Sequence, residues 1–133
     1  MNLDKLTDTE LKDIILQKQL QWIKLCQDNF LLFAKAVWPD FIYRDVKDPK
    51  KWGHHKIIAN QFEKIASGDE KRLIINMPPR HTKSEFASYL FPAWMIGRNP
   101  KMKLMQVSHN AELATRFGSK VRNLMNTREY KQI

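Results

Sequence analysis

Residues 77–84 read MPPRHTKS, and this stretch decides the predicted fold. It follows RLIINM, residues 72–77, a short apolar run rich in β-branched residues that suits a buried parallel strand. Pro78 and Pro79 stop that strand, and a helix is predicted from residue 83 to about residue 96. The sequence therefore predicts a strand, a tight turn and a helix in succession.

A second strand and a last helix continue this pattern. The apolar run at residues 103–107 is predicted to be another strand, and helical spacing of apolar residues predicts a helix from about residue 110 to residue 125. The order strand–loop–helix–strand–helix contains a βαβ unit, which implies a right-handed crossover in a parallel sheet. The predicted fold class is therefore α/β.

The segment before the first predicted strand is expected to be helical. Residues 7–37 begin with a capping box, in which Glu10 can reach back to Thr7, and an apolar run from Phe30 either continues this helix or begins a second one. Pro39 ends the helical stretch. One face of it carries Leu11, Ile15, Trp22 and Cys26.

A loop is predicted for residues 40–53, and a short helix for residues 54–66, with Gly68 as a suitable C-cap. The apolar residues predicted to be buried in that helix are Ile57, Ile58, Phe62 and Ile65. The four tryptophans are interpreted as core residues rather than as groups that stack on nucleic-acid bases: Trp22, Trp38, Trp52 and Trp94.

The composition favours a soluble, intracellular and basic domain. The chain has 133 residues and a hydrophobic share of 43%, which suits one modest core and argues against disorder. The single cysteine, Cys26, can form no intramolecular disulfide, which fits a reducing compartment. No stretch reaches the roughly 18 apolar residues of a membrane span. The formal net charge of +9 favours polyanionic partners through counterion release.

The turn at residues 77–84 meets several requirements of a phosphate-binding loop. Such a loop needs converging backbone N–H groups, a lysine that reaches the β- and γ-phosphates, a following Ser or Thr that binds Mg²⁺, and a helix N-terminus. Lys83 and Ser84 are the lysine and the hydroxyl residue, in the right order at the start of the predicted helix. Met77 and Thr82 replace the two consensus glycines. The alternative, from the pattern alone, is an ordinary strand–turn–helix with a solvated lysine.

The residues around this loop also resemble a known family. LIINM at residues 73–77, followed by PPRHTKSE at residues 78–85, is similar to the deviant Walker A of phage terminase large subunits, where the loop often reads PPRHGKSE. Further similar stretches make the resemblance span roughly residues 30–133. They are FA to WP at 33–39, GHH at 53–55, FPAW at 91–94, GRNP at 97–100, SH at 108–109, LA at 113–114, VR at 121–122 and Tyr130. Thr82 in place of glycine is the main departure.

The resemblance implies the first part of a P-loop NTPase of RecA-like fold, an incomplete parallel sheet with a helical N-terminal extension. Residues 1–53 would form the extension and a loop, and residues 54–133 the first part of the ATPase domain, with the Walker A and the first βαβ unit. An acidic Walker B strand and the carboxylates of a nuclease domain have no match in the sequence. This part alone is therefore expected to be inactive in ATP hydrolysis.

The resemblance also implies a nucleotide site in the loop. The implied contact residues are Pro79, Arg80, His81, Thr82, Lys83, Ser84 and Glu85. Lys83 would neutralise charge on the β- and γ-phosphates, Ser84 would ligate Mg²⁺, and Arg80 would stabilise charge at the γ-phosphate in the manner of an arginine finger. The alternatives for Arg80 are phosphate binding without catalysis, or a salt bridge to Glu85.

Other candidate contacts lie outside the loop. His55 and Gln61 are the candidates for holding adenine, and the alternative for both is a helix surface. Ser108 and His109 follow the second predicted strand, at the edge where ligands bind in open α/β sheets, or they simply cap the last helix. A basic cluster forms either a solvated face or a track for the DNA backbone: Arg116, Lys120, Arg122 and Arg128.

Proteins of the resembled family are motors that use ATP and Mg²⁺ to pump viral DNA into a capsid. The implied partners are double-stranded DNA, the portal protein and the small terminase subunit, the implied assembly is a homo-oligomeric ring, and the implied location is the cytoplasm of the infected host cell. The rival interpretations are another P-loop ATPase of helicase-like type, a basic nucleic-acid-binding module without ATPase activity, and a structural fragment with neither activity.

Overall fold

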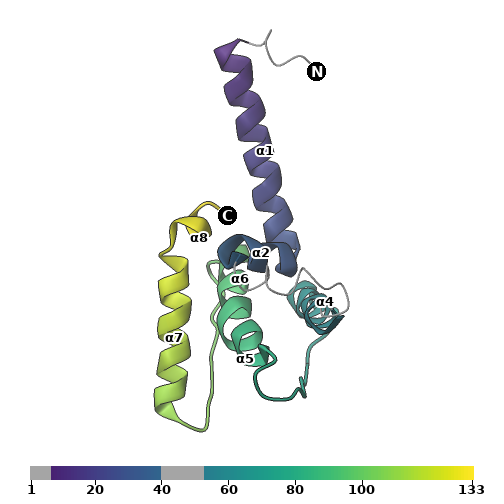
Figure 1. Cartoon of the computed structure of the whole chain (residues 1–133), viewed down its shortest axis with the longest axis vertical. Helices are drawn as coiled ribbons and strands as arrows, with labels where there is room; N and C mark the ends of the chain where they lie inside the picture. The colour runs from purple at the N-terminus through teal and green to yellow at the C-terminus, as the bar shows by residue number, and fades with distance from the viewer. Residues whose placement is uncertain (1–6, 40–52) are drawn as a thin grey trace.

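The computed structural model describes residues 7–39 and 53–133, and within these ranges the fold is all-α. The helical elements are α1 (Asp8–Asp28), α2 (Phe30–Val37), α4 (Gly53–Ser67), α5 (Lys83–Glu85), the π-helical turn η3 (Phe86–Leu90), α6 (Phe91–Arg98), α7 (Ala111–Met125) and α8 (Arg128–Lys131). α1 extends away from the other helices, and α6 lies between α4 and α7 (Figure 1).

The predicted α/β fold is wrong, because neither predicted strand is a strand in the described part of the chain. Residues 72–77 and 103–107 run as extended connections, and we call them the first and the second extended segment. Their backbone groups form no backbone–backbone hydrogen bond to another described residue. A strand exists only when a neighbour supplies hydrogen bonds along its length. The parallel sheet, the βαβ unit and its crossover are therefore absent from residues 7–39 and 53–133.

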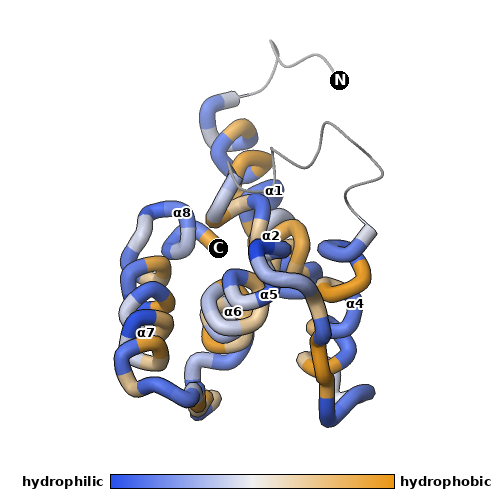
Figure 2. The backbone as a smooth tube through the Cα atoms, turned by 60° about the horizontal axis from the view of Figure 1, so that its bottom comes forward, coloured by the Kyte–Doolittle hydropathy of each residue, from blue (hydrophilic) through white to orange (hydrophobic). Residues whose placement is uncertain are grey.

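The side chains of the first extended segment still alternate as those of a strand would. Ile75 and Met77 pack against the core, whereas Ile74, the residue before Ile75, is 87% exposed. In the second extended segment Met105 is 88% exposed and Val107 is 82% exposed. In Figure 2 the orange of apolar residues appears in the connections between helices as well as in the helices. Of residues 72–77 and 103–107, only Ile75, Met77 and Gln106 are half-buried, and the other side chains are exposed.

α1 and α2 are separate helices with the break at Asn29. The predicted capping box is confirmed, because the Thr7 N–H donates to Glu10 Oε2 at 2.8 Å and the Glu10 N–H donates to Thr7 Oγ1 at 3.4 Å. Asn29 closes α1 through its own N–H, which donates to the Leu25 carbonyl. Its side chain accepts from the Leu32 N–H and so caps α2.

The core is centred on Phe30, which is fully buried. Its ring centroid lies 5.1 Å from that of Phe62 and 5.4 Å from those of Phe86 and Trp94, each pair at a steep interplanar angle. Phe91 stacks on Phe62 at 4.3 Å. We call these five residues the aromatic centre. Edge-to-face pairs of this kind stabilise a core beyond the area that they bury.

The helix predicted for residues 54–66 is confirmed as α4, and Gly68 has the positive φ, 87°, that a C-cap requires. Ile57 was predicted to be buried, but it is 63% exposed. The apolar face predicted on α1 is buried only at Cys26. Of the tryptophans, Trp94 is buried, Trp38 is half-buried and Trp22 is exposed, while Trp52 lies outside the described residues. The predicted loop at residues 40–53 also lies outside them, apart from Gly53, which begins α4.

The helix after the loop is one continuous helical segment, residues 83–98, with η3 in its middle. η3 closes with a hydrogen bond from the Phe91 N–H to the carbonyl five residues earlier. Pro92 has no N–H, so the Ser88 carbonyl cannot receive the usual α-helical hydrogen bond. The side-chain amide of Gln106 donates to that carbonyl at 2.6 Å instead. This contact attaches the second extended segment to the helix.

Candidate functional site

The loop at residues 77–84 connects the first extended segment to α5. Two of its residues, Arg80 and Thr82, have positive φ values of 65° and 62°. Thr82 is left-handed and Lys83, which follows it, is helical. Consecutive residues of opposite hand turn their N–H groups toward one side, which makes a concave place for an anion. The backbone where the loop enters α5 therefore has a conformation found in anion-binding loops.

Lys83 folds back across the loop. Its ammonium group donates to the Met77 carbonyl at 3.4 Å, six residues earlier, and the contact is part-buried. This position argues against the alternative of a fully solvated lysine. Ser84 and Arg80 are both exposed on the same loop. A lysine, a hydroxyl residue and a guanidinium group are therefore gathered in one short segment.

The carboxylate next to the loop is neutralised. Lys120 on α7 contacts both oxygens of Glu85, at 2.9 and 3.0 Å. The salt bridge considered from the sequence, between Glu85 and Arg80, is thus replaced by one to Lys120. Burial, and then the charge of Glu85, raise the pKa of the Tyr89 hydroxyl. Because Lys120 offsets Glu85, the basic groups of the loop dominate the local charge that an anion would meet.

Histidine side chains lie beside the loop. His55 Nε2 is 2.7 Å from Thr82 Oγ1, and His81 Nδ1 is 2.9 Å from the carbonyl of Pro79. The ring centroid of His54 lies 3.9 Å from that of His55 and 6.1 Å from that of His81. Among the described residues, no group of three or more His, Cys, Asp or Glu side chains is arranged to hold a metal ion. His55 and His81 therefore each form a hydrogen bond with a residue of the loop.

The two adenine candidates have different surroundings. His55 is 3% exposed and contacts the loop through Thr82, so the alternative of a helix surface does not apply to it. Gln61 is half-buried on α4 and lines a groove of about 280 Å³ together with Ile57 and residues 73–77. The loop residues predicted as phosphate contacts and His55 are thus brought together, whereas Gln61 lies in an apolar groove.

The candidate contacts near α7 are only partly brought to the loop. Lys120 is engaged by Glu85, whereas the other members of the basic cluster are exposed: Arg116, Arg122 and Arg128. Ser108 and His109 do not cap α7, because the side chain of Asn110 accepts the capping hydrogen bond. His109 is exposed beside that cap.

Sequence reasoning missed the contacts that hold the loop's helix. Lys120 is 35 residues away from Glu85, and nothing in either local pattern indicates that they pair. Gln106 carried a weak signal, since it is the polar residue within the apolar run LMQV. Pro92 carried the complementary signal, since a proline inside a helix frees the carbonyl four residues earlier.

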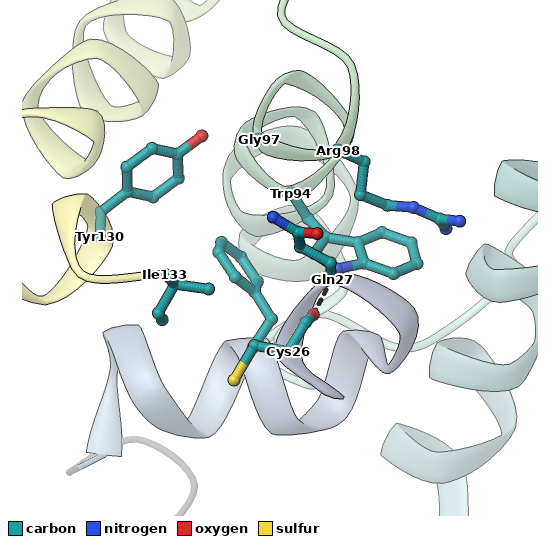
Figure 3. Close-up of a pocket in the computed structure, with 8 residues that line it drawn as sticks. Cys26, Gln27, Trp94, Gly97, Arg98, Tyr130 and Ile133 are labelled. Carbon is teal, nitrogen blue, oxygen red and sulfur yellow. Dashed lines mark hydrogen bonds between the residues drawn. The ribbon is translucent and has the colours of Figure 1, made fainter. Parts of the chain in front are cut away.

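A pocket away from the loop is too small for a nucleotide. It has a volume of about 30 Å³ and lies between α1, α2, α6 and the C-terminal residues (Figure 3). Inside it the indole N–H of Trp94 donates to the Cys26 carbonyl at 2.9 Å, and the Arg98 guanidinium lies 4.7 Å from the Trp94 ring centroid. Burial raises the pKa of the Cys26 thiol and of the Tyr130 hydroxyl. Space of this size suits a water molecule or two.

Among the helices that the structure describes, none combines the length and the apolar character needed to cross a bilayer. Comparison of the chain with known protein families, with curated proteins and with solved structures finds no match. Function is therefore inferred from the geometry of the loop and from its sequence.

Proposed function

We propose that the 77–84 loop binds the phosphate groups of ATP together with Mg²⁺, in a protein that acts as the ATP-binding part of a viral DNA-packaging motor. The observation that carries the proposal is the position of Lys83, whose ammonium group lies across the loop at the Met77 carbonyl. The resemblance of residues 73–85 to a terminase Walker A supports ATP as the ligand.

The residues present suit a triphosphate and its metal ion. Lys83 and Arg80 supply positive charge, and Ser84 offers an exposed hydroxyl group at the start of α5. Mg²⁺, when bound, would neutralise part of the charge on the β- and γ-phosphates. Glu85 does not oppose this, because Lys120 offsets its charge.

Lys83 has a direct role in this proposal. Its contact to the Met77 carbonyl is long, 3.4 Å, and is made to a neutral acceptor. A phosphate oxygen is a charged acceptor, and hydrogen bonds between charged partners are shorter and stronger. Ligand binding would therefore exchange a weak contact within the loop for a strong one to the nucleotide. Arg80, which is exposed, would be free to move toward the γ-phosphate.

Lys83→Ala tests the proposal in a calorimetric titration of the 133-residue chain with ATP and Mg²⁺. We expect a loss of affinity of about tenfold or more, because a charged hydrogen bond contributes about 1.5–3 kcal/mol and 1.4 kcal/mol is tenfold. Lys64→Ala is the matched control, since it removes the same charge from an exposed position on α4. Equal affinities of the two variants would reject the loop as the phosphate site.

A basic nucleic-acid-binding module is the second candidate function, favoured by the exposed Arg116, Arg122 and Arg128. It predicts binding of duplex DNA that weakens steeply with salt and does not respond to ATP. In the proposed motor, the same arginines would bind the backbone of double-stranded DNA, which is the substrate. The further proposed partners are a portal protein, a small terminase subunit and other copies of this chain in a ring. Another helicase-like P-loop ATPase would share the loop but would show no dependence on a capsid portal.

A further inference from the structure

Thr82 occupies a backbone conformation that its side chain disfavours. Its φ is 62°, in the left-handed region, where a β-branched residue is a conformational outlier and glycine is the usual occupant. Such a conformation persists only when surrounding contacts over-determine it. The structure must therefore supply an interaction that holds Thr82 in place.

His55 supplies that interaction. The Thr82 hydroxyl donates to the carbonyl of His81 at 2.6 Å, so its hydrogen is already used. The 2.7 Å contact between His55 Nε2 and Thr82 Oγ1 is therefore a hydrogen bond in which the imidazole Nε2–H donates and the hydroxyl oxygen accepts. We therefore assign a proton to Nε2 of His55.

The imidazole of His55 is itself held by packing. It is 3% exposed on α4, and its ring centroid lies 4.9 Å from that of Phe86, the first residue of η3. Phe86 belongs to the aromatic centre, so the position of the imidazole is tied to the core. The buried imidazole of His55 thus holds the Thr82 side chain in place. Because Thr82 directly precedes Lys83, the same contact also holds the backbone at the start of α5.

We propose that His55 is a positioning residue of the phosphate loop: through Thr82 it holds the left-handed turn that aligns the loop backbone with the start of α5. His55 acts through Thr82 and does not touch the ligand. The inference rests on the proposed function for its effect on affinity, but the hydrogen bond and its effect on the loop exist without any ligand. The hydrogen bond from His55 also explains how a threonine can occupy this position, where a glycine would adopt the positive φ without support.

The titration experiment uses Mg²⁺-ATP and tripolyphosphate as probes with a set of variants. His55→Ala is expected to lower the affinity for both probes about tenfold, the equivalent of one charged or buried hydrogen bond. His55→Gln should retain most of the affinity, because its side-chain N–H can reach the same acceptor. Ile58→Ala is the packing control, since Ile58 is buried on the same helix and its apolar side chain cannot form a hydrogen bond with Thr82, and it should lower stability but not affinity.

Thr82→Gly separates positioning from general destabilisation. Glycine adopts a positive φ without support, so His55→Ala added to Thr82→Gly should change the affinity less than twofold, whereas His55→Ala alone changes it about tenfold. An equal loss in both backgrounds would mean that His55 is only a packing residue and would overturn the inference. No loss in the wild-type background would overturn it as well.

A ligand-free measurement keeps this inference distinct from the proposed function. Long-range ¹H–¹⁵N spectra of the imidazole should show the Nε2–H tautomer for His55, and His55→Ala should shift the amide signals of residues 80–84. If no variant binds either probe but these signals behave as expected, the proposed function fails and the positioning role stands. An Nδ1–H tautomer, or unchanged amide signals in His55→Ala, would overturn the positioning role whatever the titrations show.

Discussion

The aromatic centre and the two extended segments are both built from short apolar stretches, yet they end in opposite surroundings. Phe30 is fully buried among the rings of Phe62, Phe86 and Trp94. Ile74 and Met105, from equally apolar stretches, are 87% and 88% exposed. The residues of the aromatic centre all belong to α2, α4, η3 or α6.

The difference lies in where the backbone hydrogen bonds go. A helix satisfies its own N–H and C=O groups, so that an apolar face needs only another helix to pack against. An extended segment satisfies none of its own, and it becomes a buried strand only beside a second strand. Apolar residues are therefore buried where helices pack against one another, as in the aromatic centre, whereas Ile74 and Met105 remain in solvent.

The largest expected loss of stability comes from a substitution in the aromatic centre. Phe30→Ala should lower the free energy of unfolding by about 3–5 kcal/mol, because it removes a fully buried ring and leaves a cavity. Ile74→Ala, the matched change in an extended segment, should stay within about 0.5 kcal/mol. Urea unfolding followed by tryptophan fluorescence measures both. A comparable loss for Ile74→Ala would show that the first extended segment is buried in solution.

A smaller effect is expected where the aromatic centre meets α1. Trp94→Phe keeps an aromatic ring but removes the N–H that donates to the Cys26 carbonyl. The free energy of unfolding should fall by about 1–3 kcal/mol, the cost of leaving a buried acceptor without its donor. Met105→Leu serves as the control in the second extended segment and should be neutral. A neutral Trp94→Phe would mean that the hydrogen bond contributes nothing to the attachment of α1.

The ion pair between α7 and the loop's helix should contribute less. Lys120→Met removes the charge that contacts Glu85 and should cost about 0.2–1 kcal/mol, since both side chains are partly solvated. The loss should shrink in 1 M salt, where the pair is screened. Arg122→Met on the same helix is the charge-matched control. If the loss of unfolding free energy does not depend on salt and equals that of Arg122→Met, the ion pair contributes nothing to stability.

The smallest effect concerns the N-terminal end of α1. The backbone N–H and the hydroxyl of Thr7 lower the pKa of Glu10 from its ordinary value of 4.5. A lowered pKa in the folded state means that the stabilisation is present above pH 4.5 and is lost as the pH falls through the folded value. Circular dichroism should therefore show helix loss below that pH in the wild type, and Glu10→Gln should remove this pH dependence. An identical acid transition in the variant would assign it to other carboxylates.

Local signals in the sequence identified most of the helices but wrongly predicted a sheet. The capping box at Thr7 and Glu10 and the C-cap at Gly68 mark the ends of α1 and α4 correctly. The apolar runs at residues 72–77 and 103–107 were predicted to be strands and are not, because the neighbour that would make them strands is a property of the tertiary structure.

In the candidate site, too, local features could be predicted from the sequence and long-range contacts could not. Lys83 and Ser84 could be identified because the loop is contiguous in sequence. The partners that hold the loop, His55 for Thr82 and Lys120 for Glu85, lie 27 and 35 residues away, and only packing brings them together. Nothing in the local pattern distinguishes His55 from His54 as that partner.

A ¹H–¹⁵N correlation spectrum recorded with and without Mg²⁺-ATP tests the central claim most directly, because it compares the loop with every other region at once. We predict that the largest changes occur at the amides of Thr82, Lys83 and Ser84, with little change in residues 103–107 and on α7. Changes confined to the exposed arginines of α7, or no change in residues 79–85 at millimolar ATP, would contradict the assignment of the loop as a phosphate site.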